Sequence, residues 1–148
     1  MFTQMMLPHH QQAVEMSDIL LAKKGLTPEM TTLLNNIKKA QGPELVKMKG
    51  WLKSWGVPET ASGSAHTTHA MSGMVSDANL KKLRSDNAKD ASKLFLEQMI
   101  QHHEGAIDMA NKEISGGKNP EVVALAKSVV ANQKAEIDHM KKLLAGLK

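Results

Sequence analysis

A chain of 148 residues without cysteine cannot contain a disulfide framework, a thiolate zinc site or a cysteine nucleophile. Its aromatic content of 3% and its lack of tyrosine disfavour a β-sandwich and favour a helical protein. The net charge of +4 comes from lysines spread along the chain, with Arg84 as the only arginine, so the concentrated basic face of a nucleic-acid-binding protein is not expected.

Two helices are predicted in the first half of the chain. Residues 2–24 show helical spacing of apolar side chains, and Gly25 is a suitable C′ residue for this helix. Pro8 is tolerated only in the first turn or at a kink, because it removes one helical hydrogen bond. Residues 27–29 then supply an N-cap threonine, a proline at N1 and an acidic first turn, and the second helix is expected to run to about Trp55.

A tether follows at residues 57–75 and is rich in Gly, Ser, Ala and Thr. A short helix is expected after the tether, with Ser76 as its N-cap. Val75 and Leu80 are placed to form a hydrophobic staple across this cap. Asp86 is predicted to cap the next long helix.

The second half repeats this order. A third helix carries residues 95–109 and ends near the glycine pair at 116–117, and Asn119 restarts the chain as Thr27 does in the first half. The fourth helix is expected to run to Gly146.

Short loops predict antiparallel neighbours, so the sequence predicts two helical hairpins, 2–56 and 77–147, packed as a four-helix bundle. The whole chain, 1–148, is then a single domain. No stretch is long and apolar enough to span a membrane. No signal peptide is visible, although the first repeat begins almost at Met1, as if a segment upstream had been removed.

The two hairpins are internal repeats. Six residues of the first helix recur 93 positions later in the third: Phe2, Met6, His9, His10, Ala13 and Met16 match Phe95, Met99, His102, His103, Ala106 and Met109. The partner helices match at an offset of 92, where Gln41, Glu44, Leu45, Met48 and Leu52 correspond to Gln133, Glu136, Ile137, Met140 and Leu144.

Histidine and methionine are borderline and soft metal ligands, so a duplicated cluster of both points to copper before other metals. Adjacent histidines point about 100° apart on a helix. One histidine of each pair is therefore expected to face the bundle centre and the other a neighbouring helix. The candidate metal ligands of the bundle are Met6, His9, His10, Met16, Met99, His102, His103 and Met109.

The tether holds a second cluster of possible ligands. His66, His69, Met71 and Met74 fall within nine residues, and flexible segments of this composition can wrap soft cations. Lower affinity is expected there than in the bundle, because ordering the segment costs entropy.

Other interpretations stay open at this point. Methionine at helical spacing commonly fills cores, and Glu44 and Glu136 are placed to hold the histidines, so a metal-free helical module fits the same residues. A metal-dependent redox enzyme would need an open coordination position and a substrate pocket. No catalytic motif is present, and the di-iron carboxylate pattern is broken because Lys47 stands where the match to His139 would be.

Residues 2–16, 73–76 and 95–110 closely resemble a bacterial family known as domain of unknown function 305, and the likeness covers nearly the whole chain. The resemblance implies a ferritin-like four-helix bundle, usually exported as a secreted, periplasmic or lipid-anchored protein. It also implies copper binding and copper tolerance, as in some members, through the eight bundle residues named above. The chain lacks the leader that the family normally carries. Gln98 replaces a methionine at the position that matches Met5, which makes the two halves chemically unequal.

Overall fold

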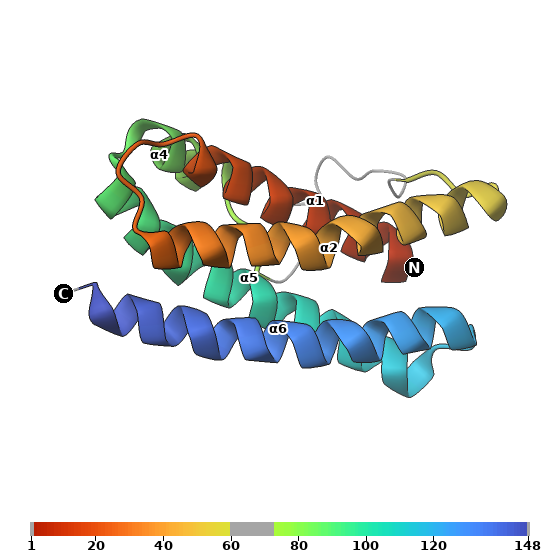
Figure 1. The fold of residues 1–148 in the computed structure, drawn as a ribbon. Helices are drawn as coiled ribbons and strands as arrows, with labels where there is room; N and C mark the ends of the chain where they lie inside the picture. Colours follow the sequence, from red (N-terminus) through yellow and green to blue (C-terminus); the bar gives the residue numbers. More distant parts are fainter. Residues whose placement is uncertain (1, 60–72, 148) are drawn as a thin grey trace.

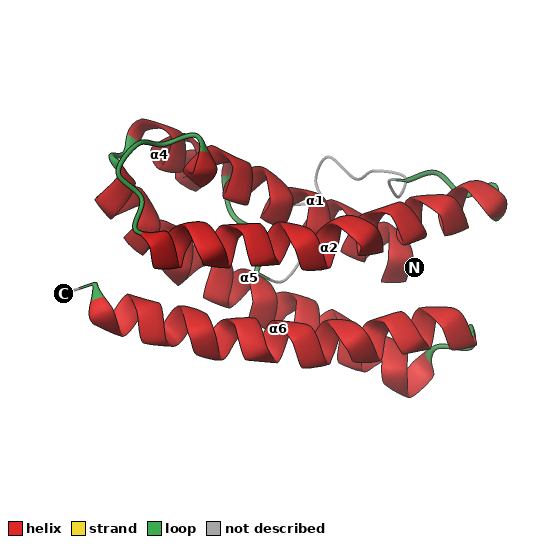
Figure 2. Ribbon diagram, viewed as in Figure 1, coloured by secondary structure: helices red, strands yellow, loops and turns green. Residues whose placement is uncertain are grey.

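Five helices make up the part of the chain that this computed structural model describes, residues 2–59 and 73–147 (Figures 1 and 2). They are α1 (Phe2–Leu21), α2 (Pro28–Ser54), α4 (Asp77–Ser85), α5 (Ala88–Gly116) and α6 (Pro120–Gly146). The same residues contain no strand, so the predicted all-α class is confirmed. None of these helices has the length and apolar character needed to cross a membrane.

Side-chain caps explain where three of the helices begin. The Thr27 hydroxyl accepts a hydrogen bond from the backbone N–H of Met30 at 3.2 Å, and Ser76 does the same for Asn79 at 3.2 Å. The Asn119 side chain caps α6 in the same way. Each cap satisfies an N–H group that has no partner within its own helix, which confirms the predicted starts.

The first helix ends earlier than the spacing of its side chains predicts. α1 stops at Leu21, because the N–H of Lys23 bonds the carbonyl oxygen of Leu20 at 2.9 Å and tightens the chain into a turn. Gly25, with φ +94°, lies in the following loop and is not the C′ residue. Pro8 lies inside α1, beyond its first turn.

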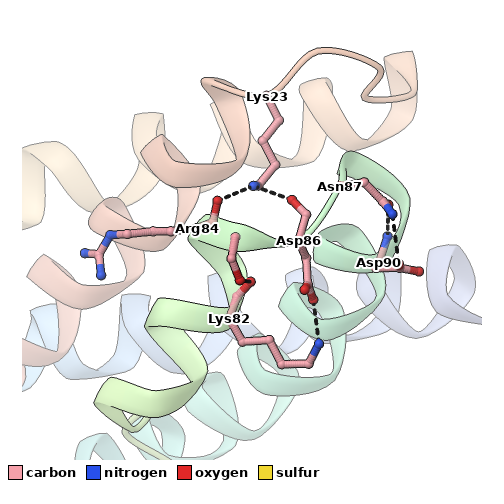
Figure 3. A network of polar contacts seen from close by, with 7 residues as sticks. Lys23, Lys82, Arg84, Asp86, Asn87 and Asp90 are labelled. Carbon is pink, nitrogen blue, oxygen red and sulfur yellow. Dashed lines mark hydrogen bonds and ion pairs between the residues drawn. The ribbon is translucent and has the colours of Figure 1, made fainter.

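The junction between α4 and α5 corrects a second prediction (Figure 3). Asn87, not Asp86, caps α5, and its side chain accepts a hydrogen bond from the N–H of Asp90 at 2.9 Å. Asp86 closes α4 instead, where its N–H bonds the carbonyl oxygen of Lys82. Lys23 fastens this junction to the loop between α1 and α2, because its ammonium group donates to the backbone carbonyl oxygens of Arg84 at 3.0 Å and Asp86 at 2.6 Å.

The two hairpins pack through equivalent helices. α1 pairs with α2 and α5 with α6, while α1 contacts α5 and α2 contacts α6 across the bundle. Since α1 corresponds to α5 in the repeat and α2 to α6, a pseudo-two-fold axis relates the two hairpins. Figure 1 shows the four long helices side by side, with α4 lying over one end of the bundle.

The core divides into two clusters of buried side chains. One, here called the α4-side core, includes Met16, Phe95, Met99 and Met140 together with Leu80 and Leu83 of α4. The other, the Phe2-side core, includes Phe2, Met6, Met48, Leu52, Met109 and Val129.

Candidate metal centre

The four paired histidines are almost fully buried in the bundle, with 1% of His9 and His102 exposed and none of His10 and His103. The rings of His9 from α1 and His102 from α5 contact each other, with centroids 3.7 Å apart and planes inclined by 38°. These two residues are equivalent in the repeat, so they meet across the pseudo-two-fold axis. The prediction that one histidine of each pair faces the centre is confirmed.

The second histidine of each pair faces the partner helix of its own hairpin. Nε2 of His103 lies 2.5 Å from Oε2 of Glu136 in α6, within hydrogen-bonding distance. Nε2 of His10 lies 3.5 Å from Oε2 of Glu44 in α2, an ion-pair distance without a hydrogen bond. Both glutamates therefore face their histidines, but only Glu136 forms a hydrogen bond with its histidine.

Burial determines the charge state of the central histidine. The pKa of His102 is lowered well below its ordinary value of 6.5, first because burial disfavours the charged ring and then because His9, His103 and His10 lie close by. His102 is thus neutral at pH 7, and a neutral imidazole offers a lone pair to a metal ion.

Several nitrogens of this cluster lack partners. Within residues 2–59 and 73–147, neither ring nitrogen of His102 has a hydrogen bond, and the same holds for Nδ1 of His10 and of His103. Buried polar atoms without partners are costly, at roughly 1–3 kcal/mol each. A bound cation would satisfy one nitrogen of each neutral ring, the nitrogen that carries the lone pair, so the residues present fit a metal ion.

Both core clusters contain buried methionines. The Phe2-side core holds Met6, Met48 and Met109, and the α4-side core holds their repeat equivalents, Met99, Met140 and Met16. Each set draws on three helices. Met48 and Met140 were not among the predicted ligands, although the offset of 92 between the partner helices carried the signal that could have identified them.

The donor set differs from a zinc or iron site of the usual kind. In the part of the chain that the structure describes, no three His, Asp or Glu side chains are arranged to hold a metal ion. The buried histidines and methionines of the bundle offer imidazole nitrogens and thioether sulfurs, and donors of these types suit soft ions.

The tether cluster is only partly described. His66, His69 and Met71 lie outside the described residues, whereas Met74 is half-buried and lines a cavity of about 270 Å³ beside α1. Gln12 fixes the next residue, Val75, through two hydrogen bonds: its Nε2 donates to the Val75 carbonyl oxygen at 2.9 Å, and its Oε1 accepts from the Val75 N–H at 2.8 Å.

The C-terminal end of the tether also lies against α5. Gly73 has φ +79°, and a Cβ atom there would overlap the carbonyl oxygen of Gln101 and lie 2.9 Å from Cα of His102. Only glycine fits this close approach. The tether thus returns to the bundle directly beside the histidine cluster.

Comparison with known proteins gives a consistent result. The sequence profile of the family described as Domain of unknown function (DUF305) matches residues 1–144. No curated protein sequence matches the chain. Among solved structures, a DUF305 protein of Streptomyces coelicolor, provisionally described as secreted, is 34% identical with a TM-score of 0.90, and the match covers 99% of this chain and 91% of that one.

Two further structures are similar. A DUF305 fragment from Deinococcus radiodurans is 31% identical with a TM-score of 0.87, and 97% of this chain and 93% of that chain are covered. CopM in its Cu(II)-bound form is 32% identical with a TM-score of 0.83, and the match covers 99% and 95% of the two chains. CopM is also known in Cu(I)-bound, Ag-bound and apo forms.

Proposed function

This chain belongs to the DUF305 family, and we propose that it binds and sequesters copper outside the cytoplasm, as Cu(I) and also as Cu(II), in copper homeostasis or tolerance. The similarity to CopM, which holds both oxidation states, supports the choice of metal. The similarity to a family member that is provisionally described as secreted supports the location.

The contact between His9 and His102 is the observation that carries this proposal. It places two imidazoles from different helices at the centre of the bundle, and one of them is neutral and lacks hydrogen bonds within the described residues. Thioethers favour Cu(I), and imidazole accepts either oxidation state, so the histidines and the buried methionines form a suitable mixed ligand set. The proposed ligands are Met6, His9, His10, Met16, Met99, His102, His103 and Met109.

The tether is proposed as an accessory site. His66, His69, Met71 and Met74 supply the same two donor types, and Gly73 in this part of the chain lies against α5 beside His102. Binding there is expected to be weaker, because wrapping an ion would fix the backbone and side chains of the segment at a cost in conformational entropy.

A competition titration tests the proposal. The apo-protein is titrated with Cu(I) against a colorimetric chelator, beside the double variant His9→Gln with His102→Gln. His139→Gln is the matched control, because it makes the same change at an exposed histidine of α6. The double variant should lose more than the roughly 10–100-fold in affinity that removal of an outer-shell partner causes. The control should bind as the wild type does.

Two outcomes would contradict this assignment. If the double variant is folded by circular dichroism and binds Cu(I) with wild-type affinity, the central histidines are not ligands. The binding site would then be assigned to residues 66–74. Absence of Cu(I) binding in the wild-type protein would overturn the proposed function itself.

A further inference from the structure

The two methionine sets of the core differ in their access to solvent. In the α4-side core, Met16 and Phe95 are completely buried, whereas their repeat equivalents in the Phe2-side core, Met109 and Phe2, are 7% and 8% exposed. Met5 lies at the surface beside this second set and is 39% exposed. The residue that matches Met5 in the other repeat is Gln98. Its side-chain amide oxygen accepts a hydrogen bond from the side-chain amide of Asn79 at 3.2 Å.

Within the described residues, the short helix α4 packs on only one of the two cores. It adds Leu80 and Leu83 to the α4-side core and contacts both α1 and α5. An ion pair of 2.6 Å between Arg84 and Glu15 holds it in place. The two hydrogen bonds from Lys23, which Figure 3 shows, hold its C-terminal end. Among the described residues, the Phe2-side core contains no side chain from α4.

An open pocket lies at the uncovered position. It has a volume of about 350 Å³ and is lined by Phe2, Met5, Met109, Lys112, Glu113 and Gly116. Met109 belongs both to this pocket and to the buried cluster that holds Met6 and Met48. Met109 therefore connects the pocket, which Met5 lines at the surface, with the buried cluster that contains Met6 and Met48. Lys112 and Glu113, which also line the pocket, carry opposite charges that offset each other. Selection among cations therefore depends on the sulfur atoms of the methionines.

We propose that this pocket is the entrance site through which a soft monovalent cation, Cu(I) or Ag(I), reaches the buried ligands, with Met5 as its first ligand and Met109 as the next. The inference deepens the proposed copper-binding function and depends on it. Thioethers are neutral and prefer soft ions, so a site of two methionines admits Cu(I) or Ag(I) and discriminates against harder divalent ions. Because no proton leaves a thioether on binding, capture there does not require deprotonation.

The first test compares uptake rates. Transfer of Cu(I) from a chromophoric chelator is followed by stopped flow for the wild type, for Met5→Leu and for Gln98→Met. Met5→Leu removes sulfur while it keeps the volume of the side chain. Gln98→Met is the matched control, since it places a thioether at the equivalent position that α4 and Asn79 cover.

The expected result is several-fold slower uptake by Met5→Leu with the equilibrium affinity unchanged. Gln98→Met should show the wild-type rate and affinity. A wild-type rate in Met5→Leu would overturn the entrance site, and so would equal slowing by both variants. Absence of Cu(I) binding by the wild-type protein at equilibrium would instead overturn the copper-binding function. Failure of the entrance site and failure of the copper-binding function can therefore be distinguished.

A second test detects the pocket directly. Protein carrying [¹³C-methyl]methionine and the double change His9→Gln with His102→Gln lacks the central imidazoles but keeps the pocket. Titration with silver nitrate should shift the methyl resonances of Met5 and Met109. The wild-type protein, given Ag(I) beyond saturation of its buried ligands, should show the same shift of Met5. An unmoved Met5 resonance in both proteins would overturn the inference.

Discussion

Phe95 and Phe2 occupy equivalent positions in the two repeats, yet Phe95 is fully buried whereas Phe2 keeps 8% of its surface exposed at the start of α1. The histidine–glutamate pairs differ in the same direction, because His103 and Glu136 approach to 2.5 Å while His10 and Glu44 remain 3.5 Å apart. The two repeats are thus physically unequal although their sequences match. α4 contacts both α1 and α5 and adds Leu80 and Leu83 to the core around Phe95, which shows that an inserted element can make equivalent positions of a repeat differ.

The largest expected effect tests this inequality in the core. Phe95→Ala should lower the free energy of unfolding by about 3–5 kcal/mol, because it leaves a cavity among side chains that cannot reach solvent. Phe2→Ala should cost clearly less, since Phe2 lies at a helix end and is partly exposed. Urea unfolding of the two apo-proteins measures both values, and equal losses would refute the view that α4 makes one end tighter.

An intermediate effect is expected at the two glutamates. Glu136→Ala removes the acceptor of the His103 ring and should cost about 1–3 kcal/mol in the free energy of unfolding. Glu44→Ala should cost less, because the pair that it breaks has no hydrogen bond to lose. Glu136→Gln keeps an acceptor oxygen and should recover part of the loss. If Glu44→Ala lowered the free energy of unfolding as much as Glu136→Ala, the difference in distance between the two pairs would not affect stability.

The smallest effect concerns pH. The pKa of folded His102 lies well below 6.5, so between these values the unfolded chain binds a proton that the folded chain does not. The stability that this group contributes is therefore complete above pH 6.5 and is lost as the pH falls toward the folded-state pKa. His9, His10 and His103 act on the same ring, and Glu44 and Glu136 face two of them.

Replacement of His102 by Asn should therefore flatten the decline in stability. The free energy of unfolding, measured between pH 7.5 and about 5 where histidine titrates, should fall less steeply in the variant than in the wild-type apo-protein. Parallel curves would show that His102 does not titrate differently in the folded and unfolded chains.

Much of the fold could be predicted from local signals in the sequence. Thr27, Ser76 and Asn119 are cap residues next to clear helical patterns, and each caps a helix in the structure. Glu44 and Glu136 match at the offset of 92 and fall on the apolar stripes of their helices, which predicted that they could hold the histidines. Such features depend on neighbours in the chain or on an internal copy, so the sequence alone displays them.

Features that depend on tertiary contacts could not be predicted. Asp86 and Asn87 are both good N-cap residues, and the choice between them depends on how α4 ends against Lys23. The cover that α4 provides over one end of the core has no counterpart in the repeat, so the repeat pattern gave no sign of the open pocket at Met5. Spacing likewise left open which histidine of each pair would face the centre.

The contact between His9 and His102 has a consequence for how such a molecule can change. In an isologous homodimer, a residue on the two-fold axis contacts the same residue of the other subunit, so one substitution alters both sides at once. Here the two copies lie in one chain, so either side can be substituted alone. Met5 and Gln98 already differ in this way, and so do Lys47 and His139. Fusion of the hairpins thereby permits one end of the bundle to specialise while the shared centre stays symmetric.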